Sequence, residues 1–541
     1  MINKTAVTVE PVSREDRSQS SRLGWAVGLS AVILVLLLAT ACQPGTLEPP
    51  RVATVTAQAA LSPTQEPTPL LSTAPTATPG GRQPQSAEGG PPTAGPIAEL
   101  TFWAMVSGDV ELETLNAGAD DFAALTGIQV EVVQVAPSLL PELIHSAVLS
   151  GTLPDLVLHP IEYTHGWRQQ GILDAEAATT VLEELGRDTF DAGALAQLEV
   201  EDESGSIAAL PSTGWQQVIL YRRDWFEQRG LAAPDTFGNL AAAAEAIYEE
   251  GSPVSGLIVP TDSSLVSTQQ VFEHMATANG CRLVSQDGEI LLLHPACLEA
   301  LEFYRALINA YSPIGLQTDI SALNGYLAGR TGIIIASPAD LPIIAGLTQQ
   351  DRATCPECIT ADYLARNTGI VTTLVGSGEY AQPTTFGAIA ALGISTAAEK
   401  EAAMAFAEYW FETLYPNWIT VNPEQKVPIR RGTADESELF LTLWSEAPLA
   451  RGGATLAELY GSEASMLLSQ NIAPADRWGL VRGQGALLST LYEELLFAPL
   501  LQDMLSGYFN SSETIVEMYL VAVEAIPGYD FPIQVAPSPT P

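Results

Sequence analysis

The sequence of 541 residues exceeds what one ordinary hydrophobic core supports, and 47% of its residues are hydrophobic, so we expect at least two packed domains. Lysine and arginine number 23 against 63 aspartates and glutamates, which gives a formal net charge of −40. A surface this acidic repels phosphate backbones and anionic lipid headgroups. The composition therefore excludes nucleic acid as an expected partner.

The first 41 residues have the parts of an export signal. Arg14, Arg17 and Arg22 precede an uncharged apolar run over residues 23–41, which ends in small residues before Cys42. The passage Leu-Ala-Thr-Ala-Cys resembles the lipobox of bacterial lipoproteins, which implies a signal peptide over 1–41 and a lipid on Cys42 that anchors the chain to the outer face of the cell membrane. The run is nearly long enough to span a bilayer, so an uncleaved transmembrane anchor and a buried helix remain alternatives.

Two segments have a composition that does not support a packed core. Residues 42–95 consist mainly of proline, threonine, alanine, serine and glycine, and we expect them to form a disordered tether. Residues 529–541 form a similar, shorter tail. The tether would hold the folded part away from the membrane.

Four cysteines follow the tether. An even number in an exported chain favours disulfides, and sequence proximity suggests Cys281 with Cys297 and Cys355 with Cys358. No histidines flank the second pair, so we expect no metal site there, and we expect no cofactor. A redox role for that pair would need a βαβ context that the sequence does not reveal.

The folded part begins with alternating strand and helix patterns. Aromatic or alternating apolar residues predict strands over 100–105, 128–135 and 154–158, and helical spacing predicts helices over 112–125 and 139–150. This βαβαβ order implies a parallel sheet with helices on both faces. Ligands of such sheets gather at the carboxyl ends of the strands.

The stretch 207–231 is interpreted as the first crossing between two lobes, beside a binding cleft. An apolar strand over 207–210 meets Pro211 and Gly214, and we expect these two residues to break the strand and turn the chain at Trp215. A β-rich run over 218–221 and a helix over 223–229, stopped by Gly230, come next.

Six segments in order resemble the family 1 extracellular solute-binding proteins of ABC importers, the maltose-binding-protein type. They are residues 122–130, 151–157, 170–174, 220–231, 326–335 and 385–395, the last followed by a predicted helix over 398–414. The resemblance implies an α/β, two-lobed periplasmic-binding-protein-like fold of type II, in which each lobe is a mixed, mostly parallel sheet flanked by helices.

The same resemblance implies how the chain divides between the lobes. Lobe one would hold residues 96–211 and 384–431, and lobe two would hold residues 212–383 and 432–528. A second crossing would lie near Pro383, and a third over 476–485. The resemblance also implies a monomer that traps a small solute by closing its lobes and passes it to the transmembrane subunits of an ABC permease.

A sugar needs flat aromatic side chains for its C–H faces and carboxylates or amides for its hydroxyls. Loop residues just past strand ends and at the crossings supply such groups. The predicted ligand-binding residues are Trp103, Ser107, His159, Glu162, Tyr163, Trp215, Gln216, Ser337, Asp340, Phe386 and Trp478. Several of these residues also have an alternative role. Trp103 would be a core residue, Glu162 would be a solvated carboxylate, and Phe386 and Trp478 would pack between the lobes.

Other functions remain open at this level. An extracellular carboxylate-dependent glycoside hydrolase is the enzyme alternative, because many carboxylates guarantee some close pairs. The sequence contains no Gly-x-Ser-x-Gly, His-Glu-x-x-His or phosphate-binding glycine-rich motif, so we expect a binding protein that is not an enzyme. A sensing or adhesive lipoprotein of the same fold without transport is the other alternative.

Overall fold

The computed structural model describes residues 99–526, apart from 107, 201–204, 286–287, 349–351, 451–452, 471, 473–476, 479 and 481–484. All described residues belong to one compact unit, Gly90–Pro541. The predicted signal peptide, Cys42, the tether and the tail lie outside the described residues, as does Ser107. Among the described helices, none is long and apolar enough to cross a membrane.

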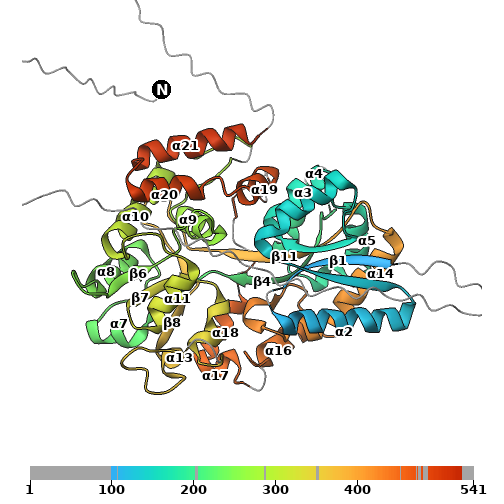
Figure 1. Cartoon of the computed structure of the whole chain (residues 1–541), viewed down its shortest axis with the longest axis horizontal. Coiled ribbons are helices and arrows are strands. Elements are labelled where there is room, and N and C mark those ends of the chain that lie inside the picture. The colour runs from blue at the N-terminus through green and yellow to red at the C-terminus, as the bar shows by residue number, and fades with distance from the viewer. Residues whose placement is uncertain are drawn as a thin grey trace, which may run out of the picture. The chain divides into compact units, whose positions relative to one another are not determined.

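The first sheet has six strands in the order β12-β4-β11-β3-β1-β2 (Figure 1). Its strands are β1 (Glu99–Met105), β2 (Gln129–Val135), β3 (Leu156–Pro160), β4 (Leu210–Gln216), β11 (Gly387–Ile394) and β12 (Val427–Pro428). The strand β1 pairs in parallel with β2 and with β3, which confirms the parallel arrangement expected of the βαβαβ opening. The later strands β11 and β12 enter antiparallel to their neighbours, so the sheet as a whole is mixed.

Helices cover both faces of this sheet. On one face lie α2 (Asp109–Thr126), α14 (Lys400–Tyr409), the π-helical turn η5 (Trp410–Leu414), α15 (Tyr415–Ile419) and α16 (Leu439–Glu446), and on the other lie α3 (Leu140–Ser150) and α4 (Thr164–Gln169). The helix α5 (Ala175–Leu185) packs against α14, and α6 (Ala192–Leu198) packs against β4. Phe102 of β1 packs edge-on against Trp410, with ring centroids 5.5 Å apart, and next to Phe406. Burial of such aromatic side chains dominates the energetics of a core.

Helix ends in the first part are set by local capping residues. Gly127 adopts φ 80° after α2, and its N–H donates to the carbonyl of Ala123. Asp174 caps α5 by accepting a hydrogen bond from the N–H of Ala177 at 2.9 Å. A left-handed glycine and an N-terminal aspartate each satisfy backbone groups that the helix leaves free, and this fixes where the helix stops or starts.

The second sheet has four strands in the order β6-β7-β5-β8. These are β5 (Val218–Arg222), β6 (Ser255–Ile258), β7 (Thr331–Ala336) and β8 (Thr368–Val371), and a short hairpin-like pair, β9 (Thr373–Leu374) with β10 (Thr384–Thr385), follows. Its surrounding helices include α7 (Arg223–Arg229), α8 (Phe237–Ile247), α9 (Val266–Ala278), α10 (Pro295–Tyr311), α11 (Asp319–Leu327), α12 (Leu341–Ile344) and α13 (Tyr363–Asn367). Parallel pairing is limited to β6 with β7.

The expectation that Pro211 and Gly214 break the strand was wrong. The strand β4 runs through both residues, from Leu210 to Gln216. Pro211 is tolerated because it lies beside an irregularity in the pairing with β11, outside the two residues that pair with β12. Gly214 lies in the strand interior, where an added Cβ would come within 2.5 Å of Ile472.

The chain passes between the two sheets at places close to those predicted. It leaves the first sheet at Gln216 and enters the second at Val218, so Gln217 alone forms the first crossing. It returns at Phe386, between β10 and β11. The predicted division into lobes stays a prediction, but strand membership moves both crossings later in the chain than Pro211 and Pro383.

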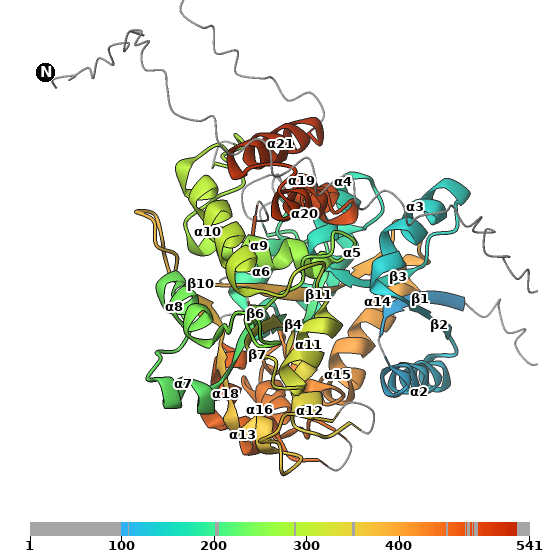
Figure 2. The same ribbon diagram turned by 60° about the vertical axis from the view of Figure 1, so that its left-hand side comes forward.

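The C-terminal region lies on both parts of the molecule. It contains α17 (Leu456–Tyr460), α18 (Ser462–Ser469), α19 (Gly485–Glu493), α20 (Ala498–Ser506) and α21 (Ser511–Glu524). The helix α19 packs against α4 beside the first sheet, whereas α20 and α21 pack against α10 beside the second (Figures 1 and 2). The disulfides Cys281–Cys297 and Cys355–Cys358 are both present, which confirms the suggested pairing.

Candidate functional site

The loop-bearing edges of the two sheets face each other across Gln217. The strand β11 is antiparallel to both β3 and β4, so β1, β3 and β4 all end at one edge of the first sheet. In the second sheet β7 and β8 both end beside the start of β5. A single linking residue leaves these two edges opposed, which is the arrangement of a site between two lobes.

Two carboxylates lie on short helices at the facing edges of the two sheets. Asp340 lies in the short helix η4 (Pro338–Asp340) after β7, and Glu424 lies in the short helix η6 (Pro423–Gln425) before β12. The helices η4 and η6 pack against each other. Glu424 is only 3% exposed, and its Oε2 atom has no hydrogen-bond partner.

Burial dominates the titration of this pair. Desolvation raises the pKa of Glu424 to about 7. Desolvation, assisted by the charge of Asp319, raises the pKa of Asp340 to about 7. Tyr460, whose hydroxyl donates to the carbonyl of Leu341 at 2.6 Å, lies near enough that both carboxylates contribute to raising its pKa, after desolvation. Among the described residues, no group of three His, Cys, Asp or Glu side chains could hold a metal ion.

The lysine next to Glu424 is engaged elsewhere. Lys426 forms a buried ion pair with Glu111 of α2 and donates to the carbonyl of Val421 at 2.6 Å. Its ammonium lies 4.3 Å from the ring centroid of Trp418. Burial lowers the pKa of Lys426, although the charge of Glu111 opposes this shift. Lys426 thus makes its direct ion pair with Glu111, while its charge also acts on Glu424 and partly offsets the effect of burial on that carboxyl.

A buried ion-pair cluster is centred on Arg477, in the segment that was predicted to be a third crossing. Arg477 donates from Nη2 to Glu162 Oε1 at 2.9 Å and from Nε to Glu273 Oε1 at 2.6 Å, and its guanidinium lies 4.1 Å from the ring centroid of Phe386. Burial opposes the charge, but the carboxylates of Glu273 and Glu162 keep the pKa of Arg477 well above its usual range. Glu162 comes from the first part, in η2 (Ile161–Tyr163), and Glu273 from α9 of the second, so Arg477 connects the two.

The structure brings three predicted residues together at this cluster: Glu162, Phe386 and Trp478. The N–H of Trp478 donates to Glu273 at 3.1 Å, and its ring packs edge-on against Phe272 and Phe497. These contacts match the packing role that was the alternative for Phe386 and Trp478.

Two further predicted residues form an aromatic layer under the first sheet edge. His159 is fully buried, with its ring 4.9 Å from that of Trp167, and Tyr163 lies 5.3 Å from the same tryptophan. Desolvation lowers the pKa of His159 to about 4, so the ring is neutral at physiological pH. In this structure both side chains belong to the core.

The remaining predicted residues are dispersed. Trp103 is half-buried in the middle of β1, in register with Val133 and Val157. Trp215 is half-buried opposite Ala388. Gln216 is buried and donates to backbone carbonyls at the end of α18, including that of Leu467 at 2.9 Å.

Apart from Asp340, only one of the predicted ligand-binding residues lies at the facing edge of the second sheet. Ser337 uses its hydroxyl to accept a hydrogen bond from the N–H of Ala339 at the start of η4, at 3.2 Å.

Sequence reasoning missed Arg477, Glu273 and Glu424. The predicted crossing over 476–485 contained Arg477 and was the one signal that pointed toward it.

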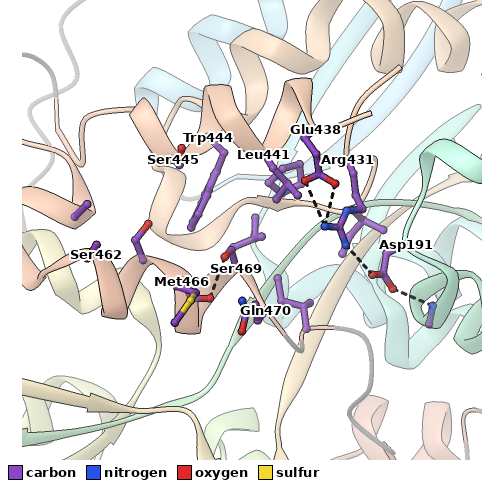
Figure 3. A pocket seen from close by; sticks show the side chains of 17 residues that line it. Asp191, Arg431, Glu438, Leu441, Trp444, Ser445, Ser462, Met466, Ser469 and Gln470 are labelled. Atoms are coloured by element: carbon purple, nitrogen blue, oxygen red, sulfur yellow. Dashed lines mark hydrogen bonds and ion pairs between the residues drawn. The ribbon is translucent and has the colours of Figure 1, made fainter. Parts of the chain in front are cut away.

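A cavity of about 800 Å³ lies beside the edge strand β12, lined by α16 and α18 (Figure 3). Trp444 and Met466 contribute apolar surface, and Ser469 contributes a hydroxyl. Arg431 lies at one end, where it pairs with Glu438 at 3.3 Å (Figure 3). None of the predicted ligand residues lines this cavity.

Comparison with known proteins agrees with this architecture. Residues 117–414 match the family model described as bacterial extracellular solute-binding protein. The chain is also similar to YcjN of Escherichia coli (strain K12), whose curated name places it among ABC transporter periplasmic-binding proteins, with 26% identity over 218 residues. That match covers 40% of this chain and half the length of YcjN.

Solved structures share the fold at low sequence identity. T. maritima MalE3 with maltose bound has a TM-score of 0.60 and 16% identity, covering 80% of this chain and 100% of that one. A solute-binding protein from Thermotoga lettingae TMO bound with α-D-tagatose has a TM-score of 0.60 and 19% identity, covering 79% and 99%. A sugar transporter from Arthrobacter chlorophenolicus A6 with laminaribiose has a TM-score of 0.59 and 14% identity, covering 79% and 100%. With a family match over more than half its length and this two-sheet fold, the chain belongs to the bacterial extracellular solute-binding proteins.

Proposed function

We propose that this protein captures a small polyhydroxylated solute, a carbohydrate, between the facing edges of its two sheets. The observation that supports this most is the buried carboxylate of Glu424, whose Oε2 atom has no hydrogen-bond partner and which lies on the edge that faces the Asp340 edge. Carboxylates are acceptors for sugar hydroxyls. The structural neighbours named above hold maltose, tagatose and laminaribiose, which favours the same class of solute.

Binding would shift the protein toward a closed arrangement. A solute that contacts both edges is bound more tightly when the edges approach, so it raises the population of the closed state. Each charge-assisted hydrogen bond contributes on the order of 1.5 to 3 kcal/mol, and several of them reach micromolar affinity after ordering costs. The closed form would then deliver the solute, chemically unchanged, to the transmembrane subunits of an ABC permease.

The remaining parts of the proposal concern where the protein is located and whether it acts as a monomer. A lipid on Cys42 would hold the chain at the outer face of the membrane, and the tether over 42–95 would give the folded part its reach. The protein would act as a monomer, since each chain supplies both edges of the site.

A thermal-shift screen tests the proposed function. The purified protein is heated with maltose, laminaribiose, D-tagatose, D-mannitol and amino acids, each at saturating concentration. A solute that binds only the folded state raises Tm, by an amount that grows with its concentration. We expect at least one sugar or polyol to raise Tm and to be recovered unaltered. Stabilisation by amino acids alone, or turnover of a sugar, would contradict the proposal.

A further inference from the structure

We infer that the cavity between α16 and α18 is a second binding site, which takes a small neutral carbohydrate. The inference goes beyond the proposed function, because neither Asp340 nor Glu424 lines this cavity. The volume of about 800 Å³ lies within the range of about 300–1,000 Å³ that is usual for small-molecule sites in proteins. Figure 3 shows Trp444 and Leu441 of α16 on one side and Met466 and Ser469 of α18 on the other.

The first argument is a buried hydroxyl without a partner. Ser465 lines the cavity and is only 8% exposed, and its hydroxyl forms no hydrogen bond with any described residue. The side chains of Ser462 and Gln470, which also line the cavity, likewise have no hydrogen bond to the described part of the chain. A polar group that is shielded from most of the solvent is stabilised when a ligand supplies the missing hydrogen bond.

The second argument is the combination of donors and acceptors on the cavity walls. Ser445 and Ser469 each donate their hydroxyl to a backbone carbonyl of their own helix, at 2.9 and 3.0 Å, so their oxygen atoms can still accept hydrogen bonds from a ligand. The Ser465 hydroxyl and the Gln470 amide can both donate and accept. A ligand that satisfies this set needs several groups that do both, and the hydroxyls of a sugar are such groups.

The third argument is the charge. Arg431 pairs with Glu438 at 3.3 Å and lies 3.9 Å from Asp191 (Figure 3). The charged side chains that line the described part of the cavity are thus already paired with one another, and the chain as a whole carries a formal net charge of −40. Anionic ligands are therefore disfavoured, and the groups left for a ligand are neutral.

The fourth argument is the apolar surface beside these polar groups. Leu441 and Met466 line the cavity from the two helices, and Met466 is 49% exposed. Trp444 is held in place because its indole N–H donates to the carbonyl of Pro423 at 2.6 Å. A sugar ring has an apolar C–H face that can be buried against such side chains while its hydroxyls contact the serines. The cavity therefore matches both kinds of surface that a carbohydrate presents.

Hydrogen–deuterium exchange of the full chain with D-glucose, maltose and laminaribiose tests this inference. We expect at least one of these sugars to slow exchange in peptides covering both α16 and α18. Ser469→Trp fills the cavity and should abolish this protection while leaving any protection of η4 and η6 unchanged. Ser506→Trp is the matched control, because Ser506 also ends a helix, α20, and donates to the carbonyl three residues earlier, at 2.8 Å. It should keep the protection of α16 and α18.

A smaller substitution tests the buried hydroxyl without changing the shape of the cavity. Ser465→Ala should raise the sugar concentration needed for half-maximal protection of α16 and α18 by about fivefold, the ratio that one hydrogen bond provides. Circular dichroism and Tm show whether each variant is folded, and Ser465→Ala decides the matter if Ser469→Trp is not.

The outcomes separate this inference from the proposed function. Protection of η4 and η6 without α16 and α18, protection of α16 and α18 that persists in folded Ser469→Trp, or an unchanged midpoint in Ser465→Ala would overturn the inference while the proposed function stands. Protection of α16 and α18 alone would support the inference and contradict the proposed function. Absence of protection by any of the sugars at either place would overturn both.

Discussion

Arg477 shows how single residues hold the two parts of this protein together. Its guanidinium is buried between Glu162 of the first part and Glu273 of the second. A buried ion pair contributes little net stability compared with apolar packing, but removing one partner leaves the others charged in a dry environment. The contact between the two parts around Arg477 is therefore sensitive to any change that unbalances the charges of the cluster.

Replacing Arg477 tests this account. Arg477→Met should lower the free energy of unfolding by about 3–5 kcal/mol, because two buried carboxylates lose their counter-charge. Urea titration followed by tryptophan fluorescence measures the change. As a control, Arg366→Ala removes an exposed pair with Asp362 on α13 and should cost less than about 0.5 kcal/mol. Equal effects of the two substitutions would show that the Arg477 cluster is not buried as described.

The pair Asp340 and Glu424 predicts a pH dependence. Each carboxyl has a folded-state pKa near 7, above its ordinary value, so between about pH 4 and 7 the folded state binds more protons than the unfolded state. Stability from these groups is thus fully present at low pH and is lost as the pH rises through 7. The double variant Asp340→Asn with Glu424→Gln should gain Tm relative to the parent as the pH increases from 4.5 to 7.5. A difference in Tm that stays constant with pH would contradict the assignment.

The sequence identified some of these residues and not others, for a physical reason. Glu162 and Phe386 were predicted because each follows a recognisable strand or crossing. Arg477 and Glu162 are 315 positions apart, so no local pattern indicates their contact. Glu273 lies in α9, whose residues are buried on every side, so the helical period does not single it out.

At the scale of elements, the contact between α4 and α19 is unusually close. The N–H of Gly166 donates to the hydroxyl of Ser489 at 2.9 Å, and that hydroxyl donates to the carbonyl of Glu162 at 2.7 Å. A Cβ on Gly166 would lie 2.5 Å from Cβ of Ser489, and a Cβ on Gly485 would lie 2.5 Å from the His165 ring. The two helices approach this closely only because glycine is present at both positions.

The substitution Gly166→Ala should therefore destabilise the protein by about 1–3 kcal/mol, although alanine favours helix formation, because the contact cannot accept another methyl group. Gly238→Ala in α8 is the matched control, since the nearest atom to its added Cβ lies 3.9 Å away, and it should be neutral or slightly stabilising. Ser489→Gly should relieve part of the cost in the double variant. Equal stability of the parent and Gly166→Ala, measured by chemical denaturation, would rule out this packing.

Local signals predicted most element boundaries well. The helix α7 begins at Arg223 and ends before Gly230, as read from the sequence, because a left-handed glycine stops it. The strand β4 was cut short in the prediction because Pro211 and Gly214 normally disrupt strands. The structure keeps it continuous through pairing with β11 and β12, and those partners lie far along the chain.

At the scale of the whole molecule, the family and fold class were predictable because six segments occur in a recognisable order, and the family match and the structural neighbours confirm them. The position of the site was less predictable. The aromatic rings of His159, Tyr163 and Trp478, chosen as sugar contacts, pack in the core or between elements. The unsatisfied carboxylate of Glu424 lies in a short helical turn that carries no sequence signature. The proposed capture of a solute between two opposed sheet edges connects these observations.

Hydrogen–deuterium exchange with and without the sugar that raises Tm most tests this capture directly. We expect slower exchange in peptides covering both η6, at Pro423–Gln425, and η4, at Pro338–Asp340, because the solute would bring the two edges together. Protection limited to one of these edges, or confined to the cavity between α16 and α18, would contradict the account.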